Sequence, residues 1–269
     1  METNSISGSI SVFFPAFNDA RAISPLILSA LDVLPTLTDD YEVLVVNDGS
    51  TDATRAVLDE MARSCAQLKV IHHQRNLGYG AALRSGFSHA TKDLIFYTDG
   101  DGQYDVREFP ALHSELSSDV DVVNGFKAQR ADALYRRLLG GLYNGLVRQL
   151  FRLPIRDVDC DFRLLRRSAL DRISLEASSG VICVELVHKL KSAGCVFREV
   201  PVHHYQRSYG RSQFFTPRRV AHTLADLFAF WLSIATERMS RRVSLLSPCP
   251  RVKTEESVNV VLGVSKCEE

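Results

Sequence analysis

The sequence lacks the features that mark several common classes of protein. Its six cysteines include no C-x-x-C pair, which argues against a zinc site and against a disulfide framework. It has no uninterrupted apolar run of about 18 residues, so no transmembrane helix is expected. Lys and Arg together number 32, as do Asp and Glu, so no excess of charge favours nucleic acid. The N-terminus lacks the pattern of a signal peptide, and a reducing cytoplasmic location is expected.

What the sequence contains instead is an alternation of short apolar strands and amphipathic helices. Apolar, β-branched or aromatic runs predict strands at 10–14, 42–46, 68–71 and 94–98, with helices between them. This alternation predicts an α/β fold, with a mostly parallel, Rossmann-like sheet and helices on both faces. Ligands bind such sheets beyond the carboxyl ends of the strands. Polar stretches follow the four strands at 15–19, 47–52, 76–80 and 99–105.

The alternation weakens in the second half of the chain. Helices are expected at 107–117, 131–151 and 180–193, and strands at 120–125 and 196–203. Residues 217–239 have a wide apolar arc flanked by arginines, which indicates a helix that docks on the domain or lies in a membrane interface. The expected organisation is a flexible N-terminus (1–9), one domain (10–215), an amphipathic C-terminal helix (216–239) and a disordered tail (240–269).

The strand at 94–98 ends in an acidic, glycine-rich corner. Asp99 and Asp101 are separated by one residue, and the amide of Gln103 follows two positions later. Carboxylate and amide oxygens are the hard ligands that Mg²⁺ and Mn²⁺ prefer, and Mg²⁺ completes its shell with water and substrate phosphate. The alternative interpretation is an ordinary acidic turn, since Asp-Gly pairs are common in loops.

Three further stretches carry groups that suit a nucleotide or a phosphate. Asp48 follows the second strand and offers a carboxylate to a nucleobase or ribose, although this turn could also be a plain helix cap. The stretch 76–80, with Arg84 one turn into the next helix, is typical of a loop that approaches a phosphate or of a structural turn. Arg207 lies in a basic loop that suits a diphosphate or, alternatively, only solvent.

Taken in order, these stretches resemble the family 2 glycosyltransferases, which have the GT-A fold. The segments that carry the resemblance are 12–18, 46–52, Asn76 with Gly78 and Gly86, and 99–103. Within that family, Phe162–Arg163, the segment 199–202 and the spacing of Arg207, Gly210 and Ser212 resemble the polyprenyl-phosphate sugar transferases, the dolichyl-phosphate mannose synthase branch. The resemblance covers residues 10–214, and it implies that 10–105 form the nucleotide-binding half of the domain and 106–215 its acceptor half.

The resemblance implies roles for individual residues. It implies that the donor nucleotide is held by Pro15, Phe17, Asn18, Asp48, Gly78, Arg84 and Asp99. It implies that Mg²⁺ or Mn²⁺ binds the donor diphosphate through Asp99, Asp101 and Gln103. Arg207 and Ser212 would line the phosphates, so that Arg207 acts in catalysis beside the two aspartates. The acceptor phosphate would be met by Lys127, Arg130, Arg136, Arg137 and Ser212.

The sequence also departs from the family pattern at several positions. Asp19 stands where the family often has Glu, Asn47 where it often has Asp, and Gly102 where it often has Leu, but none of these changes removes an implied ligand. Many relatives also carry C-terminal membrane helices, which are not expected here.

The implied reaction is an inverting transfer of a sugar from a GDP- or UDP-sugar to a polyprenyl phosphate, by an enzyme peripheral to the cytoplasmic face of a membrane. The membrane surface and a separate membrane protein are candidate partners. A phosphate acceptor is largely ionised at neutral pH, whereas a sugar hydroxyl needs a base, for which Asp157 and Asp159 are candidates unless their stretch is only a solvated loop.

Three alternative functions belong to other classes or subclasses. One is a family 2 enzyme that acts on a saccharide or a small-molecule hydroxyl. Another is a protein that binds nucleotide sugars without activity. The third, a dinucleotide-dependent oxidoreductase, is opposed by the missing G-x-G-x-x-G after the first strand.

Overall fold

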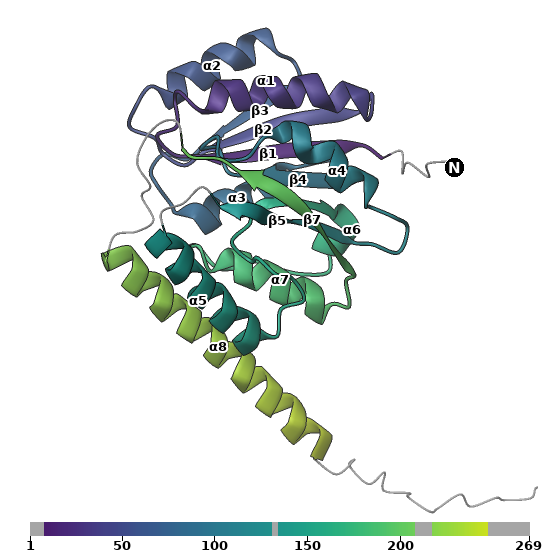
Figure 1. Cartoon of the computed structure of the whole chain (residues 1–269), viewed down its shortest axis with the longest axis vertical. Helices are drawn as coiled ribbons and strands as arrows, with labels where there is room; N and C mark the ends of the chain where they lie inside the picture. The colour runs from purple at the N-terminus through teal and green to yellow at the C-terminus, as the bar shows by residue number, and fades with distance from the viewer. Residues whose placement is uncertain (1–7, 131–133, 208–216, 247–269) are drawn as a thin grey trace, which may run out of the picture. The chain divides into compact units, whose positions relative to one another are not determined.

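The computed structural model describes residues 8–130, 134–207 and 217–246 (Figure 1). The chain divides into two units, Met1–Phe230 and Trp231–Glu269. The strands are β1 (Ile10–Ala16), β2 (Tyr41–Asn47), β3 (Leu68–His72), β4 (Leu94–Thr98), β5 (Val122–Arg130), β6 (Phe162–Arg166) and β7 (Phe197–His204). The α-helices are α1 (Ile23–Val33), α2 (Thr54–Ser64), α3 (Tyr79–His89), α4 (Phe109–Ser114), α5 (Leu134–Phe151), α6 (Arg167–Leu170), α7 (Ile182–Ser192) and α8 (Pro217–Leu246).

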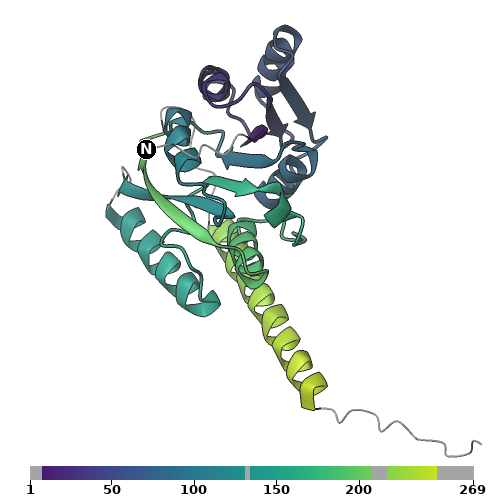
Figure 2. The same cartoon turned by 90° about the vertical axis from the view of Figure 1, so that its right-hand side faces the viewer.

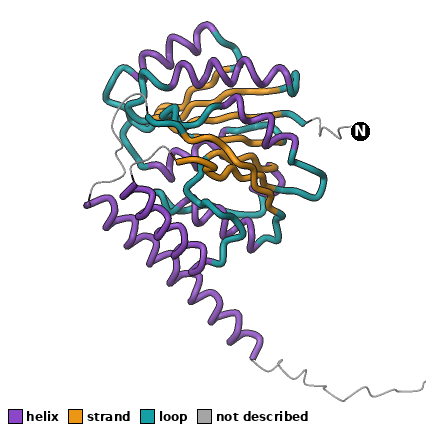
Figure 3. Tube along the Cα trace, in the orientation of Figure 1, coloured by secondary structure: helices purple, strands orange, loops and turns teal. Residues whose placement is uncertain are grey.

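The seven strands form one sheet in the order β3-β2-β1-β4-β6-β5-β7. Strand β1 is parallel to β2 and to β4, and β2 is parallel to β3. Strand β6 is antiparallel to its neighbours β4 and β5, while β5 is parallel to β7. Figure 3 shows the strands in orange with helices above and below them. The predicted α/β fold, with a mostly parallel sheet covered on both faces, is confirmed.

Both faces of the sheet are apolar, because successive side chains of a buried strand point to opposite sides. On one side, the ring of Phe96 in β4 lies 4.5 Å from that of Phe109 in α4. On the other, the ring of Phe13 in β1 lies 5.0 Å from that of Phe87 in α3. Gly86 allows this approach, because a Cβ at that position would come within 2.3 Å of the Phe13 ring. The two views of Figures 1 and 2 show helices on both sides of the strands.

Strand β6 is absent from the sequence-based expectation. Its residues follow a run of alternating acidic residues, and Arg163 interrupts its apolar pattern. In the structure Phe162 and Leu164 are fully buried, and so is Arg163. A strand can hold a buried arginine only where hydrogen bonds satisfy the guanidinium, which a sequence pattern does not reveal.

Helix α2 begins at Thr54, where the carboxylate of Asp52 accepts a hydrogen bond from the Thr54 amide at 2.9 Å. Helix α8 continues to Leu246, so the tail expected from residue 240 is helical for its first seven residues. Over the ranges that the structure describes, every helix is too short or too polar to cross a membrane.

Glu42 is buried at the amino end of β2, away from the polar strand ends, and only 3% of its surface is exposed. Its carboxylate accepts hydrogen bonds from Ser11 Oγ at 2.7 Å, from Lys69 Nζ at 2.7 Å and from the Thr91 amide at 2.6 Å. Burial by itself opposes ionisation, but these bonds outweigh it and lower the pKa of Glu42 to about 2. The carboxylate therefore joins β1, β2, β3 and the segment before β4 as a charged group.

Replacing Glu42 with glutamine is expected to lower the free energy of unfolding by about 2 kcal/mol at neutral pH. The pKa is about 2 in the folded protein against an ordinary value of 4.5, so the wild-type advantage is complete above pH 4.5 and is lost as the pH falls toward 2. Urea unfolding of both proteins across this pH range measures the effect. Asp40→Asn, at an exposed carboxylate, is the control. A difference between Glu42→Gln and wild type that stays constant down to pH 2 would contradict the prediction.

Candidate active site

The carboxyl ends of β1, β2 and β4 lie next to one another. Ala16 and Asn47 form the last residue pair between β1 and β2. Just beyond it, the Asp48 amide donates to the Ala16 carbonyl at 2.9 Å, and the Gly100 amide donates to the Pro15 carbonyl at 3.1 Å. The structure thus brings the polar stretches after the first, second and fourth strands together at one edge of the sheet, as the sequence predicts.

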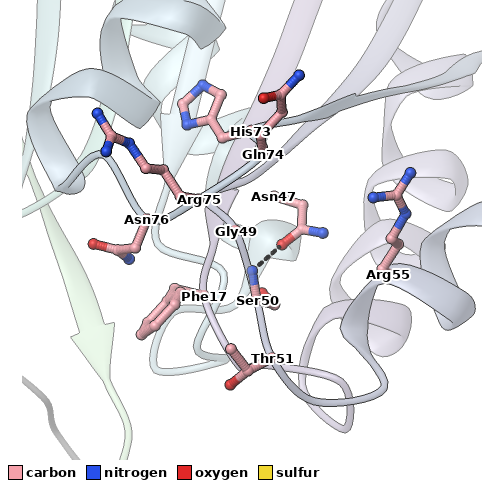
Figure 4. A pocket seen from close by; sticks show the side chains of 10 residues that line it. All are labelled: Phe17, Asn47, Gly49, Ser50, Thr51, Arg55, His73, Gln74, Arg75 and Asn76. Carbon is pink, nitrogen blue, oxygen red and sulfur yellow. Dashed lines mark hydrogen bonds between the residues drawn. The ribbon is translucent and has the colours of Figure 1, made fainter.

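A cavity of about 360 Å³ opens at the ends of β2 and β3 (Figure 4). Phe17 contributes an aromatic ring, and Arg55 and Arg75 lie on opposite sides of the cavity. The other lining residues are Asn47, Gly49, Ser50, Thr51, His73, Gln74 and Asn76. A second cavity of about 480 Å³ shares the 73–75 segment and adds Leu77. An aromatic ring, guanidinium groups and amides are the groups that suit a nucleobase and its ribose.

Asp48, a predicted nucleotide contact, organises the wall of both cavities. Its Oδ1 accepts hydrogen bonds from His73 Nδ1 at 2.7 Å and from the Leu77 amide at 2.8 Å, and its Oδ2 accepts one from the Gly78 amide at 2.9 Å. Since an ionised carboxylate only accepts, Nδ1 of His73 carries the proton. A carboxylate oxygen has two acceptor sites, so Oδ2 can still accept from a ligand. A direct contact between Asp48 and a nucleotide stays a prediction.

Asn18 and Asp19 follow β1 and lie between the loop after β2 and the acidic corner after β4. Asn18 has a φ of 59°, and its Oδ1 accepts from the amides of Thr51 at 2.8 Å and Asp52 at 3.3 Å. Burial raises the pKa of Asp19 to about 6, and the negative charge of Asp101 adds to the rise. The loops after β1 and β4 therefore place like charges near one another.

Asp99 lies at the end of β4, where its surroundings disfavour a negative charge. The Tyr79 hydroxyl donates to Asp99 Oδ1 at 2.7 Å. Burial raises the pKa of Asp99 well above its ordinary value, and the charges of Asp161 and Asp101 raise it further. Neighbouring carboxylates of this kind are stabilised when a cation joins them.

Arg207 reaches the acidic corner from the loop after β7. Its Nη2 donates to Asp101 Oδ2, while its buried Nε has no hydrogen-bond partner among the residues that the structure describes. The loop is held by two bonds, because the Tyr205 amide donates to the Gln103 carbonyl at 2.9 Å and Gln103 Nε2 donates to the Tyr205 carbonyl at 3.0 Å. A guanidinium with a spare donor suits a ligand with several anionic oxygens.

The groups at the acidic corner suit a divalent cation whose coordination shell is completed by water and substrate phosphate. Asp99 and Asp101 offer carboxylate oxygens, and Gln103 offers an amide oxygen because its nitrogen is bonded to Tyr205. Within the described ranges, no group of three or more His, Cys, Asp or Glu side chains forms a metal site. Two carboxylates with water and substrate phosphate are the usual Mg²⁺ environment, so a complete protein cage is not required.

Among the residues predicted to bind the acceptor, Lys127 is the one whose side chain the structure places. Its Nζ donates to the Asp159 carbonyl at 2.8 Å, and its charge partly offsets the rise in the pKa of Asp99. Asp157, a candidate base, is 4% exposed. Its loop is held by Asn144 of α5, whose Oδ1 accepts from the Val158 amide at 3.2 Å.

The other predicted acceptor residues are located by their backbone or lie outside the description. Arg130 is the last residue of β5, and Arg136 and Arg137 lie in the first turn of α5. Ser212 lies outside the described residues. Their contacts with an acceptor stay predictions.

Arg84 and Gly78, both predicted to meet the nucleotide, connect α3 to the segment before α7. The Nη1 atom of Arg84 donates to the carbonyls of Glu176 and Ala177. Gly78 has a φ of 99°, and a Cβ there would lie 2.6 Å from the Ser178 carbonyl oxygen. These contacts fix the start of α3, and a nucleotide contact of Arg84 stays a prediction.

Sequence reasoning missed a buried polar cluster next to Asp99. Arg163, fully buried, donates to Asn124 Oδ1 and, at 2.7 Å, to the Tyr97 hydroxyl. The Tyr97 hydroxyl in turn donates to Asp161 Oδ1 at 3.3 Å, and Cys183 Sγ lies 3.2 Å from the same oxygen. The sequence signal that could have indicated this cluster is the pair Asp161 and Arg163, which stand on either side of Phe162. These hydrogen bonds hold the carboxylate of Asp161, whose negative charge raises the pKa of Asp99.

Comparison with known proteins identifies related sequences. The model of glycosyl transferase family 2 matches residues 11–174. The chain is also similar to the undecaprenyl-phosphate 4-deoxy-4-formamido-L-arabinose transferase of Enterobacter sp. (strain 638), with 29% identity over 206 residues. That alignment covers 76% of this chain and 62% of the relative, so the chain spans less than two thirds of the relative's length.

Solved structures share the fold. The chain is similar to the mannosyltransferase PcManGT from Pyrobaculum calidifontis in complex with GDP-Man and Mn²⁺, with a TM-score of 0.63 and 22% identity over 84% of this chain and 65% of that one. It is similar to the glucosyl-3-phosphoglycerate synthase from Mycobacterium tuberculosis in complex with UDP, with a TM-score of 0.62 and 18% identity over 83% and 80% of the two chains. These likenesses support the predicted GT-A architecture.

Proposed function

Because the chain belongs to glycosyl transferase family 2, we propose that it transfers a sugar from a GDP- or UDP-sugar to a polyprenyl phosphate. The observation that carries the proposal is the corner of Asp99, Asp101 and Arg207 at the ends of parallel strands, beside a cavity suited to a nucleobase. The similar enterobacterial protein is named for transfer to undecaprenyl phosphate, and the similar structures contain GDP-Man with Mn²⁺ or UDP. These names support both the donor class and the acceptor class.

On the donor side, the cavity and the acidic corner would bind different parts of the nucleotide sugar. The nucleobase and ribose would occupy the cavity beside Phe17, with the diphosphate at the corner. Mg²⁺ or Mn²⁺, held by Asp99, Asp101 and Gln103, would neutralise the charge that develops on the departing diphosphate. Arg207, whose Nε lacks a described partner, would donate to diphosphate oxygens on the same side.

On the acceptor side, a phosphate oxygen would attack the anomeric carbon as the bond to the nucleotide diphosphate breaks. Attack from the opposite face inverts the configuration of the sugar. A phosphate monoester has a second pKa near 6, so the attacking oxygen is already ionised at neutral pH and needs no strong base. Lys127 would hold this phosphate near the corner, together with Arg130, Arg136, Arg137 and Ser212. The acceptor would be presented at the cytoplasmic face of a membrane, and a separate membrane protein is a further candidate partner.

A sugar hydroxyl is the second candidate acceptor. It would need a carboxylate to take its proton. The buried Asp157 and the nearby Asp159, whose carbonyl binds Lys127, are the observation that favours this alternative.

The test is release of nucleoside diphosphate from GDP-mannose, UDP-glucose and UDP-N-acetylglucosamine, with Mg²⁺ or Mn²⁺, in the presence and absence of a polyprenyl phosphate. Turnover that needs both metal and lipid would support the proposal and identify the sugar. Turnover with a soluble saccharide alone would contradict the lipid acceptor and favour Asp157 or Asp159 as a base. No turnover with any of these donors, with or without the lipid, would contradict the proposed transfer.

Replacing Tyr79 with phenylalanine is expected to weaken metal binding about tenfold, because a hydrogen bond to a charged group contributes roughly 1.5–3 kcal/mol. The change removes the 2.7 Å bond to Asp99 Oδ1, which favours the ionised carboxylate. Mn²⁺ titration monitored by electron paramagnetic resonance, with nucleoside diphosphate present, measures the affinity without turnover. Tyr41→Phe, at the opposite end of the sheet, is the control. Equal Mn²⁺ affinities for Tyr79→Phe and wild type would contradict this role.

A further inference from the structure

The carboxylate of Asp48 has a single hydrogen-bond acceptor site left for a ligand. An ionised carboxylate offers about four such sites, two on each oxygen. Both sites of Oδ1 are taken, because His73 Nδ1 donates to it at 2.7 Å and the Leu77 amide donates to it at 2.8 Å. The Gly78 amide donates to Oδ2 at 2.9 Å and takes one of the two sites there. A ligand that meets this carboxylate can therefore donate one hydrogen bond, to Oδ2.

His73 is held so that its bond to Asp48 is fixed. Ser85 of α3 binds the other ring nitrogen, since its Oγ lies 2.9 Å from Nε2. The carboxylate can only accept, so Nδ1 carries a proton whether the ring is neutral or charged. The side chains of His73 and Asp48 are only 9% and 5% exposed, so little water reaches the bond between them. The ring cannot turn over without losing a hydrogen bond, and Oδ1 therefore stays filled.

The Asp48 carboxylate belongs to the wall of the cavity in which we place the nucleobase. Asn47 and Gly49, its neighbours along the chain, both line that cavity (Figure 4). His73, its hydrogen-bond partner, lines the same cavity and the adjoining cavity of about 480 Å³. The edge of a bound base is therefore the group expected to fill the open site of Oδ2.

The two bases of the proposed donors differ in what they offer to a carboxylate. Guanine carries two neighbouring donors on one edge, N1–H and the N2 amino group, which pair best with both oxygens of a carboxylate. Uracil carries one donor, N3–H, between the acceptors O2 and O4. Arg55 and Arg75, on opposite sides of the cavity, can donate to carbonyl oxygens of either base and do not decide between them. At Asp48, however, one guanine donor would face a filled oxygen, whereas uracil would leave no donor unpaired.

We propose that the donor is a UDP-sugar, and that His73 selects uracil over guanine by filling the second acceptor site of Asp48 Oδ1. This inference rests on the proposed function, which allows either base. The fold leaves the choice open, because one of the similar solved structures contains GDP-Man and another contains UDP. His73 acts through Asp48 and is a positioning residue. Its expected effect is on the ratio of the two nucleotide affinities and not on the rate of sugar transfer.

The first measurement is the affinity of the full wild-type chain for UDP and for GDP, each with Mn²⁺, by isothermal titration calorimetry without sugar or lipid. UDP is expected to bind at least about tenfold more tightly, because a guanine donor against a filled oxygen would be a buried polar group without a partner. GDP that binds as tightly as UDP, or more tightly, would overturn the inference and leave the proposed transfer standing. Binding of neither nucleotide would overturn both, so the two failures are distinguishable.

Two substitutions of nearly equal shape test the part of His73. In His73→Asn the side-chain amide can donate to Asp48 Oδ1 in place of Nδ1, so the preference for UDP should stay within about threefold of wild type. His73→Leu has no donor and frees a site on Oδ1, so the preference should fall about tenfold. A loss of local structure would weaken both nucleotides together, and an unchanged ratio in His73→Leu would contradict the role of His73. The wild-type ratio decides the choice of base even if His73→Leu unfolds.

Discussion

Replacing Asp101 with asparagine is expected to lower turnover by at least about 1,000-fold at saturating donor. The substitution keeps the size of the side chain but removes a charge that is both a candidate metal ligand and the partner of Arg207. A factor of this size corresponds to about 4 kcal/mol of stabilisation lost as the diphosphate departs. Steady-state release of nucleoside diphosphate, with the metal concentration varied, measures it.

The control for this prediction is Asp105→Asn. Asp105 lies in the same loop, and its carboxylate pairs at 3.1 Å with Arg107, whose side chain is exposed. It should leave both the rate and the metal dependence within about threefold of wild type. A rate for Asp101→Asn within tenfold of wild type, in a protein that unfolds at the normal urea concentration, would contradict the assigned role of the acidic corner.

Replacing Arg163 with methionine is expected to lower the free energy of unfolding by about 3–5 kcal/mol, the usual cost of removing one partner from a buried charged network. Methionine fills similar space but leaves Asn124 Oδ1 and the Tyr97 hydroxyl without their donor. It also removes the positive charge that balances the buried Asp161 through Tyr97. Urea unfolding followed by circular dichroism measures the loss.

Two further variants make the Arg163 prediction specific. Arg163→Lys keeps the charge but cannot form the same set of bonds, so an intermediate loss is expected. Arg107→Met, at an arginine that is 73% exposed, should change stability by less than about 0.5 kcal/mol. A loss below about 1 kcal/mol for Arg163→Met would mean that the buried cluster contributes little to the fold.

The sequence was a reliable guide where local patterns determine structure. The first four strands and the polar stretches after them follow from apolar runs and from the rule that parallel strands share a carboxyl edge. Strand β6 escaped prediction because its Arg163 is stabilised by Asn124 and Tyr97, which lie 39 and 66 residues away in the sequence. No window of sequence around β6 contains that information.

In the candidate site, too, the residues could be found from the sequence but the directions of their side chains could not. The acidic residues Asp99 and Asp101 were found from their position after a strand, and their proximity to Arg207 was implied only by resemblance. Arg84 was expected at a phosphate because it lies one turn into a helix, yet its side chain binds carbonyls 92 and 93 residues away. The direction of a side chain depends on what packs around it, and spacing along the chain does not specify it.

The α/β alternation, the edge of the sheet at which ligands bind and the chemical types of the groups gathered there were all predictable from the sequence. These follow from burial periodicity and strand connectivity, which are properties of short segments and their order. The fold was needed to show that Asp48 accepts hydrogen bonds from the Leu77 and Gly78 amides, that Arg207 binds Asp101 across 106 residues, and that α5 exposes a row of leucines. Each depends on which surfaces of distant segments meet, because burial and hydrogen bonding are settled by packing in three dimensions.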